Sequence, residues 1–213
     1  MNAINDPCVY LVDDSPSVLQ AMRRVLEAFG LKVAGFDSAQ AFLAAMEPDA
    51  EGCLVLDVRM PGMDGLQLQD ALAGHGSVLP VIFLTGHGDI EMSVHAMKHG
   101  AMDFLTKPVD SERLFAAVRS ALEKSRVAAR ERSSLHVIEQ RLASLTARER
   151  EVLEHLICGK LNKQVAFDLG TVEKTIKVHR SRIMQKMQVR SVAELVRLCD
   201  AAGVEPASGR EGR

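Results

Sequence analysis

The first 124 residues alternate five times between a short apolar run and a segment whose apolar residues have helical spacing. The runs occupy residues 8–12, 32–36, 54–56, 81–84 and 104–105. The first helical segment begins after Ser15, a capping residue, with Pro16 in its first turn. Strands that alternate with helices run parallel, because a crossover returns the chain to the same end of the sheet. The pattern therefore predicts an α/β fold with a five-stranded parallel sheet and helices on both faces.

Polar residues follow four of these runs at the points where the predicted strands end. Asp13 and Asp14 follow the first run, Asp57 the third, Thr85 the fourth, and Lys107 the fifth after one intervening residue. Carboxyl ends of parallel strands meet at one edge of a sheet, so these side chains are expected to converge. Crowded carboxylates repel one another unless a cation is bound, and Mg²⁺ prefers such oxygen ligands. A carboxylate can also carry a phosphoryl group, with a lysine ammonium beside its oxygens.

The charge of the chain is divided unevenly along its length. The whole chain has a formal charge of −2, which argues against a nucleic-acid partner. Residues 1–124, however, hold 17 acidic and nine basic residues, a net −8, whereas residues 125–213 hold 11 and 17, a net +6. Such asymmetry predicts two domains with different partners, the second of them nucleic acid.

The segment between the two halves, residues 120–144, contains no proline or glycine and is predicted to be helical. Within it Leu135, Ile138, Leu142 and Leu145 are spaced three, four and three residues apart. This spacing has two interpretations. The helix packs on its own domain, or it pairs with the same helix of a second protomer as a short coiled coil.

Several classes of protein are excluded by composition. No apolar run approaches the roughly 20 residues that span a bilayer, and the N-terminus lacks the basic and apolar regions of a signal peptide. The four cysteines, Cys8, Cys53, Cys158 and Cys199, lie too far apart for a metal or disulfide motif. We therefore expect a cytoplasmic protein with reduced thiols and no membrane partner.

The basic half predicts a small all-α domain. Thr146 and Glu149 have the spacing of a capping box, and the helix that they open ends at Gly159. A second helix covers residues 162–169 and is broken by Gly170, and a third covers residues 172–187. A helix, a turn with glycine and another helix indicate a helix-turn-helix unit.

The third helix of this half has two different faces. Its core face is predicted from Ile176, Ile183 and Met187. His179 lies between them and is either a packed, hydrogen-bonded core residue or a DNA contact, of which the first is favoured. The opposite face is polar and basic: Lys174, Lys177, Val178, Ser181 and Gln185, flanked by Arg180, Arg182 and Lys186. A basic face opposite a core face suits insertion into the major groove of DNA, although a merely solvated helix can look the same.

Four motifs of the acidic half resemble the receiver domain of bacterial two-component response regulators. They are residues 12–14, 54–65, 84–87 and 104–108. The resemblance implies a flavodoxin-like (βα)5 receiver over residues 1–124. It also implies that Asp57 accepts a phosphoryl group from a sensor histidine kinase. Asp13, Asp14, Asp57 and the backbone carbonyl of Arg59 would then hold Mg²⁺.

The same resemblance implies a switch around the phosphoacceptor. Lys107 would pair with the phosphoryl group, Thr85 would reorient onto it, and Phe104 would swing inward. The Lys107–Pro108 bond would be cis. The loop at residues 86–89 resembles that of the FixJ-type subgroup, and its His87 is either a solvated residue or one that tunes the site.

Short motifs at residues 145–149, 162–163, 169–170 and 174–179 carry a second resemblance. On them, residues 143–203 resemble the DNA-binding domain of the LuxR/FixJ/NarL type. The resemblance implies a DNA-binding domain over 143–205, after a helical linker over 125–142 and before a flexible tail over 206–213. It implies base contacts from Lys177, Val178 and Ser181. Backbone contacts are implied from Asn162, Lys163, Lys174, Thr175, Arg180 and Arg182. The sequence departs from the family pattern at Thr171 and Val172, and Thr171 is a candidate cap for the helix.

These features predict a transcription regulator, an activator of the FixJ type, whose phosphorylation switches dimerisation and binding to double-stranded promoter DNA. The homodimer would form through the fourth and fifth helices, and RNA polymerase is a further candidate partner. Beyond its own phosphoryl transfer and dephosphorylation, no enzyme activity is expected. Two alternatives remain: an Mg²⁺-dependent aspartyl-phosphate phosphohydrolase, although Arg59 stands where its second acid belongs, and a DNA-binding protein that acts independently of phosphorylation.

Overall fold

The computed structural model describes residues 7–47, 49–86 and 90–207. The chain divides into two compact units, Met1–Arg130 and Glu131–Arg213. Among the described residues, no helix is both long enough and apolar enough to cross a membrane.

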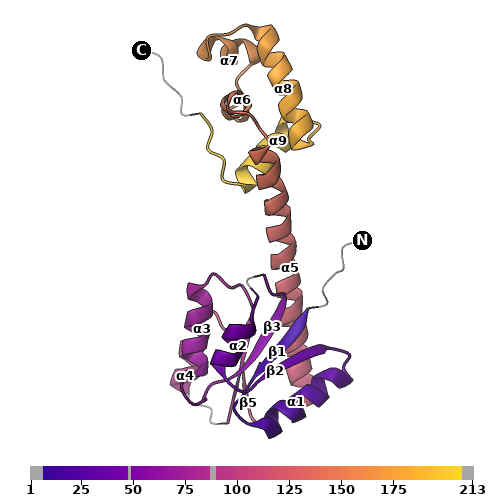
Figure 1. Ribbon diagram of the computed structural model, residues 1–213, viewed down its shortest axis with the longest axis vertical. Helices are drawn as coiled ribbons and strands as arrows, with labels where there is room; N and C mark the ends of the chain where they lie inside the picture. The colour runs from indigo at the N-terminus through magenta and orange to yellow at the C-terminus, as the bar shows by residue number, and fades with distance from the viewer. Residues whose placement is uncertain (1–6, 48, 87–89, 208–213) are drawn as a thin grey trace. The chain divides into compact units, whose positions relative to one another are not determined.

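The first unit contains a five-stranded parallel sheet, as the alternating pattern predicts (Figure 1). Its strands are β1 (Cys8–Val12), β2 (Lys32–Phe36), β3 (Gly52–Asp57), β4 (Val81–Thr85) and β5 (Asp103–Thr106). They are arranged in the order β2-β1-β3-β4-β5, and every neighbouring pair is parallel. The first two strands have the predicted bounds. The other three are longer than their apolar runs, because polar residues such as Asp103 and Thr106 also take part in the pairing.

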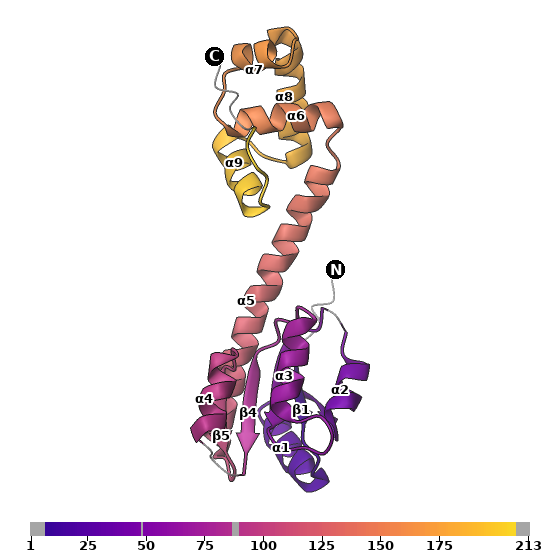
Figure 2. The same ribbon diagram turned by 90° about the vertical axis from the view of Figure 1, so that its left-hand side faces the viewer.

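Helices cover both faces of the sheet. On one face lie α1 (Pro16–Ala28) and the start of α5 (Ser111–Ala143), and on the other lie α2 (Ala39–Ala45), α3 (Gly65–Gly74) and α4 (Ile90–Lys98) (Figures 1 and 2). Alternate residues of strand β3 pack against the helices on opposite faces of the sheet. Leu54 and Leu56 pack towards α2 and α3, whereas Cys53 and Val55 pack towards α1 and α5. Burial on both faces explains why this strand is apolar throughout rather than alternating.

One helix start in the first unit differs from the prediction, and one helix is longer than the alternating pattern alone requires. Ser15 is the residue before α1, but its side chain makes no capping hydrogen bond; its amide instead donates to Asp13 Oδ1 at 2.9 Å. The last helix of the alternating pattern and the helical segment predicted over residues 120–144 form one uninterrupted helix that ends at Ala143. Ser125 within it is buried, and its hydroxyl accepts a hydrogen bond from the Gly52 amide at 3.0 Å. The helix continues because the sequence offers no glycine or proline that would stop it.

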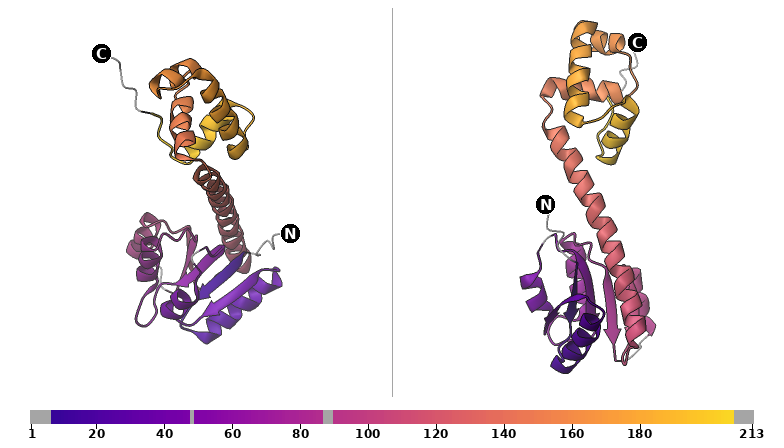
Figure 3. Two further views of the ribbon diagram at one scale, coloured as in Figure 1. Left: turned by 45° about the horizontal axis from the view of Figure 1, so that its top comes forward. Right: turned by 90° about the vertical axis from the view of Figure 1, so that its right-hand side faces the viewer.

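The second unit is all helical, as predicted (Figure 3). After the end of α5 come α6 (Ala147–Ile157), α7 (Asn162–Asp168), α8 (Glu173–Met187) and α9 (Val192–Ala201). Ile138, Leu142 and Leu145 are buried in the core of this unit. Their burial favours the interpretation in which the helix packs on its own domain over the coiled-coil interpretation.

A charged pair lies within this helical core. Glu149 is only 2% exposed, and its carboxylate accepts hydrogen bonds from Lys186 Nζ at 2.6 Å and from the Thr146 amide at 2.9 Å. The predicted capping box of Thr146 and Glu149 is therefore confirmed. The hydrogen bond from Lys186, together with those from Thr146, lowers the pKa of Glu149 from 4.5 to about 2. The pair joins the start of α6 to the end of α8.

Replacement of Glu149 by glutamine is predicted to destabilise the second unit. Glu149→Gln removes a buried charge-assisted hydrogen bond and leaves Lys186 without its anion, so the free energy of unfolding should fall by about 2 kcal/mol at neutral pH. Because the folded-state pKa lies below the ordinary value, this contribution is complete above pH 4.5 and is lost as the pH falls towards about 2. Urea unfolding followed by circular dichroism measures it.

Glu151→Gln is the matched control on the same helix. Its carboxylate lies 2.6 Å from Arg148, but the side chain is 51% exposed. Such a surface pair should contribute less than about 1 kcal/mol. Equal losses in the two variants would contradict a special role for the buried pair.

Candidate functional site

Three carboxylates meet at the carboxyl edge of the sheet, as predicted. Asp13 and Asp14 directly follow β1, and Asp57 is the last residue of β3. Each offers an oxygen that lies within 4.8 Å of the others. Asp13 is buried, Asp57 is 9% exposed and Asp14 is exposed. The cluster is therefore accessible from the solvent on the side of Asp14. This set of oxygens, with its excess of negative charge, fits a hard divalent cation.

Lys107 brings the one ammonium group that is paired with this cluster among the described residues. It follows β5 and lies 2.5 Å from Asp13 Oδ2 and 3.3 Å from Asp57 Oδ1. The Lys107–Pro108 peptide bond is cis, as expected. One positive charge against three carboxylates leaves the edge underneutralised. Burial raises the pKa of Asp57, Asp13 raises it further, and Lys107 opposes both effects.

The remaining predicted residues of this site surround the cluster at different depths. Thr85 ends β4 and is 2% exposed, and its carbonyl accepts the Lys107 amide at 2.7 Å. Phe104 is half-buried, with its ring centroid 6.1 Å from that of Phe83. The side chain of Arg59 is exposed, two residues after Asp57. His87 lies outside the described residues.

Gly65, at the start of α3, permits a close approach that the motif analysis did not identify. A Cβ atom there would lie 2.3 Å from the Asp57 carbonyl oxygen and 3.1 Å from both Val58 Cα and the Phe83 ring. The Gly65 amide also donates to the Val58 carbonyl at 2.9 Å. The absence of a side chain therefore lets α3 begin directly against the backbone that carries Asp57.

The second candidate site is the exposed face of α8. Ile176, Ile183 and Met187 are completely buried, which confirms the predicted core face. The opposite face is exposed: Lys174, Lys177, Val178, Ser181, Arg182 and Gln185. Lys177 pairs with Glu173 at 2.9 Å along the helix surface. Val178 is 45% exposed, so this valine lies outside the core of the unit.

The residues predicted to flank this face have different surroundings. Arg180 donates to Asn162 Oδ1 at 3.4 Å, which joins α8 to the start of α7. Lys163 is exposed and Thr175 is half-buried. Lys186 differs, because its ammonium is held by Glu149 and by the Ser144 carbonyl at 2.9 Å. The Lys186 side chain therefore binds within its own unit and is not part of the exposed basic face.

Two local expectations for α8 are wrong. Val172, rather than Thr171, is the residue before the helix, and no side chain caps it. His179 is half-buried as expected, but its Nδ1 atom is buried without a hydrogen-bond partner. The helix start is instead supported by backbone bonds from Thr175 and Ile176 to the Val172 carbonyl, at 2.9 and 3.3 Å.

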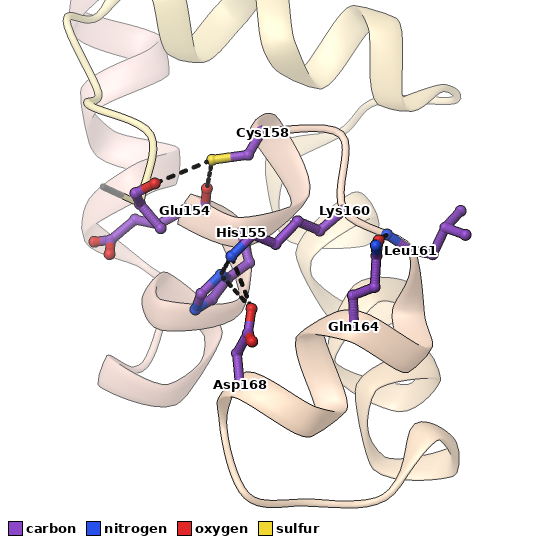
Figure 4. Close-up of polar contacts among 8 residues, drawn as sticks. Glu154, His155, Cys158, Lys160, Leu161, Gln164 and Asp168 are labelled. Carbon is purple, nitrogen blue, oxygen red and sulfur yellow. Dashed lines mark hydrogen bonds and ion pairs between the residues drawn. The ribbon is translucent and has the colours of Figure 1, made fainter. Parts of the chain in front are cut away.

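A polar cluster between α6 and α7, shown in Figure 4, was not predicted. Lys160 Nζ lies 2.7 Å from Asp168 Oδ2 and 3.2 Å from His155 Nδ1, and its hydrogen bond lowers the pKa of Asp168. Gln164 accepts the Leu161 amide at 2.8 Å. These contacts fix the turn that sets α7 against α6. Their sequence signal is weak, because the charged residues lie five and eight positions apart.

The two halves of the chain match two known families. Residues 9–119 match the response regulator receiver domain, and residues 143–199 match the luxR family of bacterial regulatory proteins. Both matches agree with the resemblances inferred from the motifs.

Relatives share both halves in the same order and at nearly full length. The transcriptional regulatory protein FixJ of Azorhizobium caulinodans is 45% identical over 199 residues, which cover 93% of this chain and 94% of the relative. The response regulator protein TodT of Pseudomonas putida is 44% identical over 195 residues, covering 90% and 85%. The solved structure of response regulator StyR is 45% identical, with a TM-score of 0.84 and coverage of 92% and 98%.

Replacement of Gly65 by alanine is predicted to disturb the acidic cluster. The new Cβ would overlap the Asp57 carbonyl oxygen, so the backbone that carries Asp57 must move. The free energy of unfolding should therefore fall by about 1 to 3 kcal/mol. Gly74→Ala, in the last turn of the same helix, meets open space and should be neutral or stabilising by up to about 1 kcal/mol. A Gly65 variant as stable as the Gly74 variant in calorimetric unfolding would refute this role.

Proposed function

The chain belongs to the response regulators that join a receiver domain to a LuxR-type DNA-binding domain, and from this premise we propose that phosphoryl transfer to Asp57 switches dimerisation and promoter binding. The observation that carries the proposal is the position of the Asp57 carboxylate. It reaches the surface beside two further carboxylates, with Lys107 Nζ at 3.3 Å. A sensor histidine kinase is the phosphoryl donor that this family implies.

The proposed phosphoryl transfer needs a nucleophile and positive groups that offset the negative charge of the carboxylates and the phosphoryl oxygens. An Asp57 carboxylate oxygen attacks the phosphorus of a phosphohistidine, an O–P bond forms, and the P–N bond to the kinase breaks. Asp13, Asp14 and Asp57 would hold Mg²⁺ together with the backbone carbonyl of Arg59. When bound, the ion supplies positive charge that offsets the carboxylates and the phosphoryl oxygens. Lys107 would pair with one of these oxygens.

The switch then follows from the charge that phosphorylation adds. A phosphoryl group brings about −1.5 to −2 charge and several acceptor oxygens. Thr85 would turn its hydroxyl towards them, and the ring of Phe104 would move inward into the space beside it. This movement would bias the surface formed by α4, β5 and α5 towards homodimer formation.

The second unit would read DNA through α8. Lys177, Val178 and Ser181 would contact base edges, while Asn162, Lys163, Lys174, Thr175, Arg180 and Arg182 would contact the backbone. A dimer would place two such helices on half-sites about 34 Å apart, or a multiple of that spacing. We propose a receiver over 1–124, a linker over 125–142, a DNA-binding domain over 143–205 and a tail over 206–213. The protein would act in the cytoplasm as an activator that contacts RNA polymerase.

The phosphohydrolase alternative shares the acidic cluster and Lys107 with the proposal, but it lacks an acid that it needs. Such an enzyme needs a second acid two residues after its nucleophile, and the exposed Arg59 occupies that position. The relatives that match over nearly the whole chain are named as regulators.

Loss of the phosphoacceptor is predicted to abolish the response to phosphorylation. With acetyl phosphate and Mg²⁺, the wild-type protein should dimerise, and its affinity for promoter DNA should rise about 5- to 150-fold. Asp57→Asn should show neither change in sedimentation and fluorescence-anisotropy measurements. Asp70→Asn, an exposed change on α3, is the control and should respond like the wild type. Equal responses from Asp57→Asn and the wild type would refute the gating role of Asp57.

Two lysines of α8 are predicted to have separable effects on DNA binding. Lys177→Ala should weaken binding to a site found by in vitro selection by about 1 to 3 kcal/mol and relax its sequence preference. Lys174→Ala should weaken binding to all sequences alike and reduce the salt dependence of log K by about 0.9. An unchanged selected sequence for Lys177→Ala would exclude that residue from base reading.

A further inference from the structure

Two histidines at the end of α4 have rings that lie against each other: His95 is in the last turn of the helix, and His99 directly follows its last residue, Lys98. His95 and His99 are four residues apart, so both project from one face of the helix. Their ring centroids are 4.0 Å apart and the rings are nearly parallel, at 20°. Both side chains are exposed, whereas the neighbouring Ala96 is buried. The receiver mechanism proposed above assigns nothing to this pair.

The hydrogen bonding of His99 leaves a nitrogen available for a metal ion. Its Nδ1 lies 2.8 Å from the His95 carbonyl. A carbonyl only accepts, so Nδ1 carries the proton, and the lone pair of the neutral ring is on Nε2. This is the arrangement of most metal-ligating histidines, in which the second nitrogen donates to a carbonyl or carboxylate. Two histidines at this spacing on one helix face also form the core of helical zinc motifs.

The turn that carries the pair is fixed in place by its neighbour α3. Gln69 is 5% exposed, and its Nε2 donates to the His99 carbonyl at 3.1 Å and to the Ala96 carbonyl at 3.4 Å. Ala96 itself is completely buried. An anchored turn loses little freedom when a ligand binds, which favours affinity.

The electrostatic setting also favours a cation. The pair lies at the carboxyl end of α4, where the helix dipole is negative. Residues 1–124 carry a net −8, which raises the local concentration of cations around this half. Lys98, in the same turn, opposes this effect with one positive charge.

We propose that His95 and His99 together chelate a borderline divalent transition-metal ion, such as Ni²⁺, Cu²⁺ or Zn²⁺. Imidazole nitrogens suit these ions, whereas the all-oxygen cluster of Asp13, Asp14 and Asp57 suits Mg²⁺. Metal–nitrogen bonds of about 2.0 to 2.1 Å place two ligating nitrogens roughly 3 to 4 Å apart, and the ring centroids are already 4.0 Å apart. The rings are stacked at 20°, so one ring must rotate out of the stack for both Nε2 lone pairs to point at the ion. The bound ion clamps the last turn of α4.

Calorimetric titration of the full-length protein with Ni²⁺, in excess Mg²⁺, tests the chelate. The wild type should show a binding step of one equivalent. Loss of a residue that only hydrogen-bonds to a metal ligand costs about 10- to 100-fold in metal affinity. Loss of a ligand itself, in His95→Ala or His99→Ala, should therefore lower the Ni²⁺ affinity at least tenfold. Both side chains are exposed, and His95→Gln and His99→Gln keep a polar side chain if alanine impairs folding. Unaltered Ni²⁺ affinity in the His95 and His99 variants would overturn the proposal.

Two further variants separate the pair from other ligands. His75 makes the same bond, from Nδ1 to the Ala71 carbonyl at 2.7 Å, but has no histidine four residues away, so His75→Ala should bind Ni²⁺ like the wild type. Cys158 is an exposed thiol, and Cys158→Ser should also leave the step unchanged. Loss of the step in either variant would assign it to that residue and contradict the chelate.

A second measurement does not depend on heats of binding. An ion that binds only the folded state raises the unfolding temperature. Ni²⁺ should therefore raise the midpoint of thermal unfolding of the wild type and of His75→Ala, and leave that of His95→Ala unchanged. Equal rises in all three proteins would count against the site.

Discussion

The excess of carboxylate over ammonium at one edge of the sheet is the constraint on which the first unit depends. Both faces of the sheet are covered by helices, so polar side chains gather where the strands end. There Lys107 is shared between Asp13 and Asp57, while Asp14 faces the solvent. The arrangement is costly in charge repulsion, and a stable core on both faces is what allows the fold to retain it.

In the second unit, by contrast, the buried carboxylate is fully paired. Glu149 and Lys186 form a closed pair in which the carboxylate also accepts the Thr146 amide. The same end of α8 is held from α5, since Arg141 donates to the Met187 carbonyl at 3.1 Å and to Gln188 Oε1 at 2.9 Å. These contacts fix the position of α8 within its unit. Its exposed basic face can therefore vary without disturbing the packing.

The sequence predicted the fold and the convergence of the acidic cluster because both follow from strong, repeated signals. Strands buried on both faces are apolar throughout, and their ends are marked by Asp13, Asp57 and Lys107. Local details were missed where tertiary contacts prevail. Ser15 does not cap α1 with its side chain, and its amide bonds to Asp13. Lys186 was predicted to flank the basic surface of its helix, but the fold places its ammonium against Glu149, 37 residues earlier in the sequence. The bounds of helix α9 were not predicted, although Ser191 and Glu194 mark its start.

The geometry of Lys107 links the two ligands that the receiver is proposed to take. Its ammonium lies 2.5 Å from Asp13 Oδ2, and Asp13 is 4% exposed. If Lys107 turns to a phosphoryl group on Asp57, the Asp13 carboxylate keeps the hydrogen bond from the Ser15 amide but loses its positive counter-ion while it remains buried. A buried carboxylate without a counter-ion is costly, so a divalent cation beside Asp13 would offset the movement of Lys107. If the receiver takes both ligands, the affinity for the cation and the stability of the aspartyl phosphate would be coupled, and each would strengthen the other by the same factor.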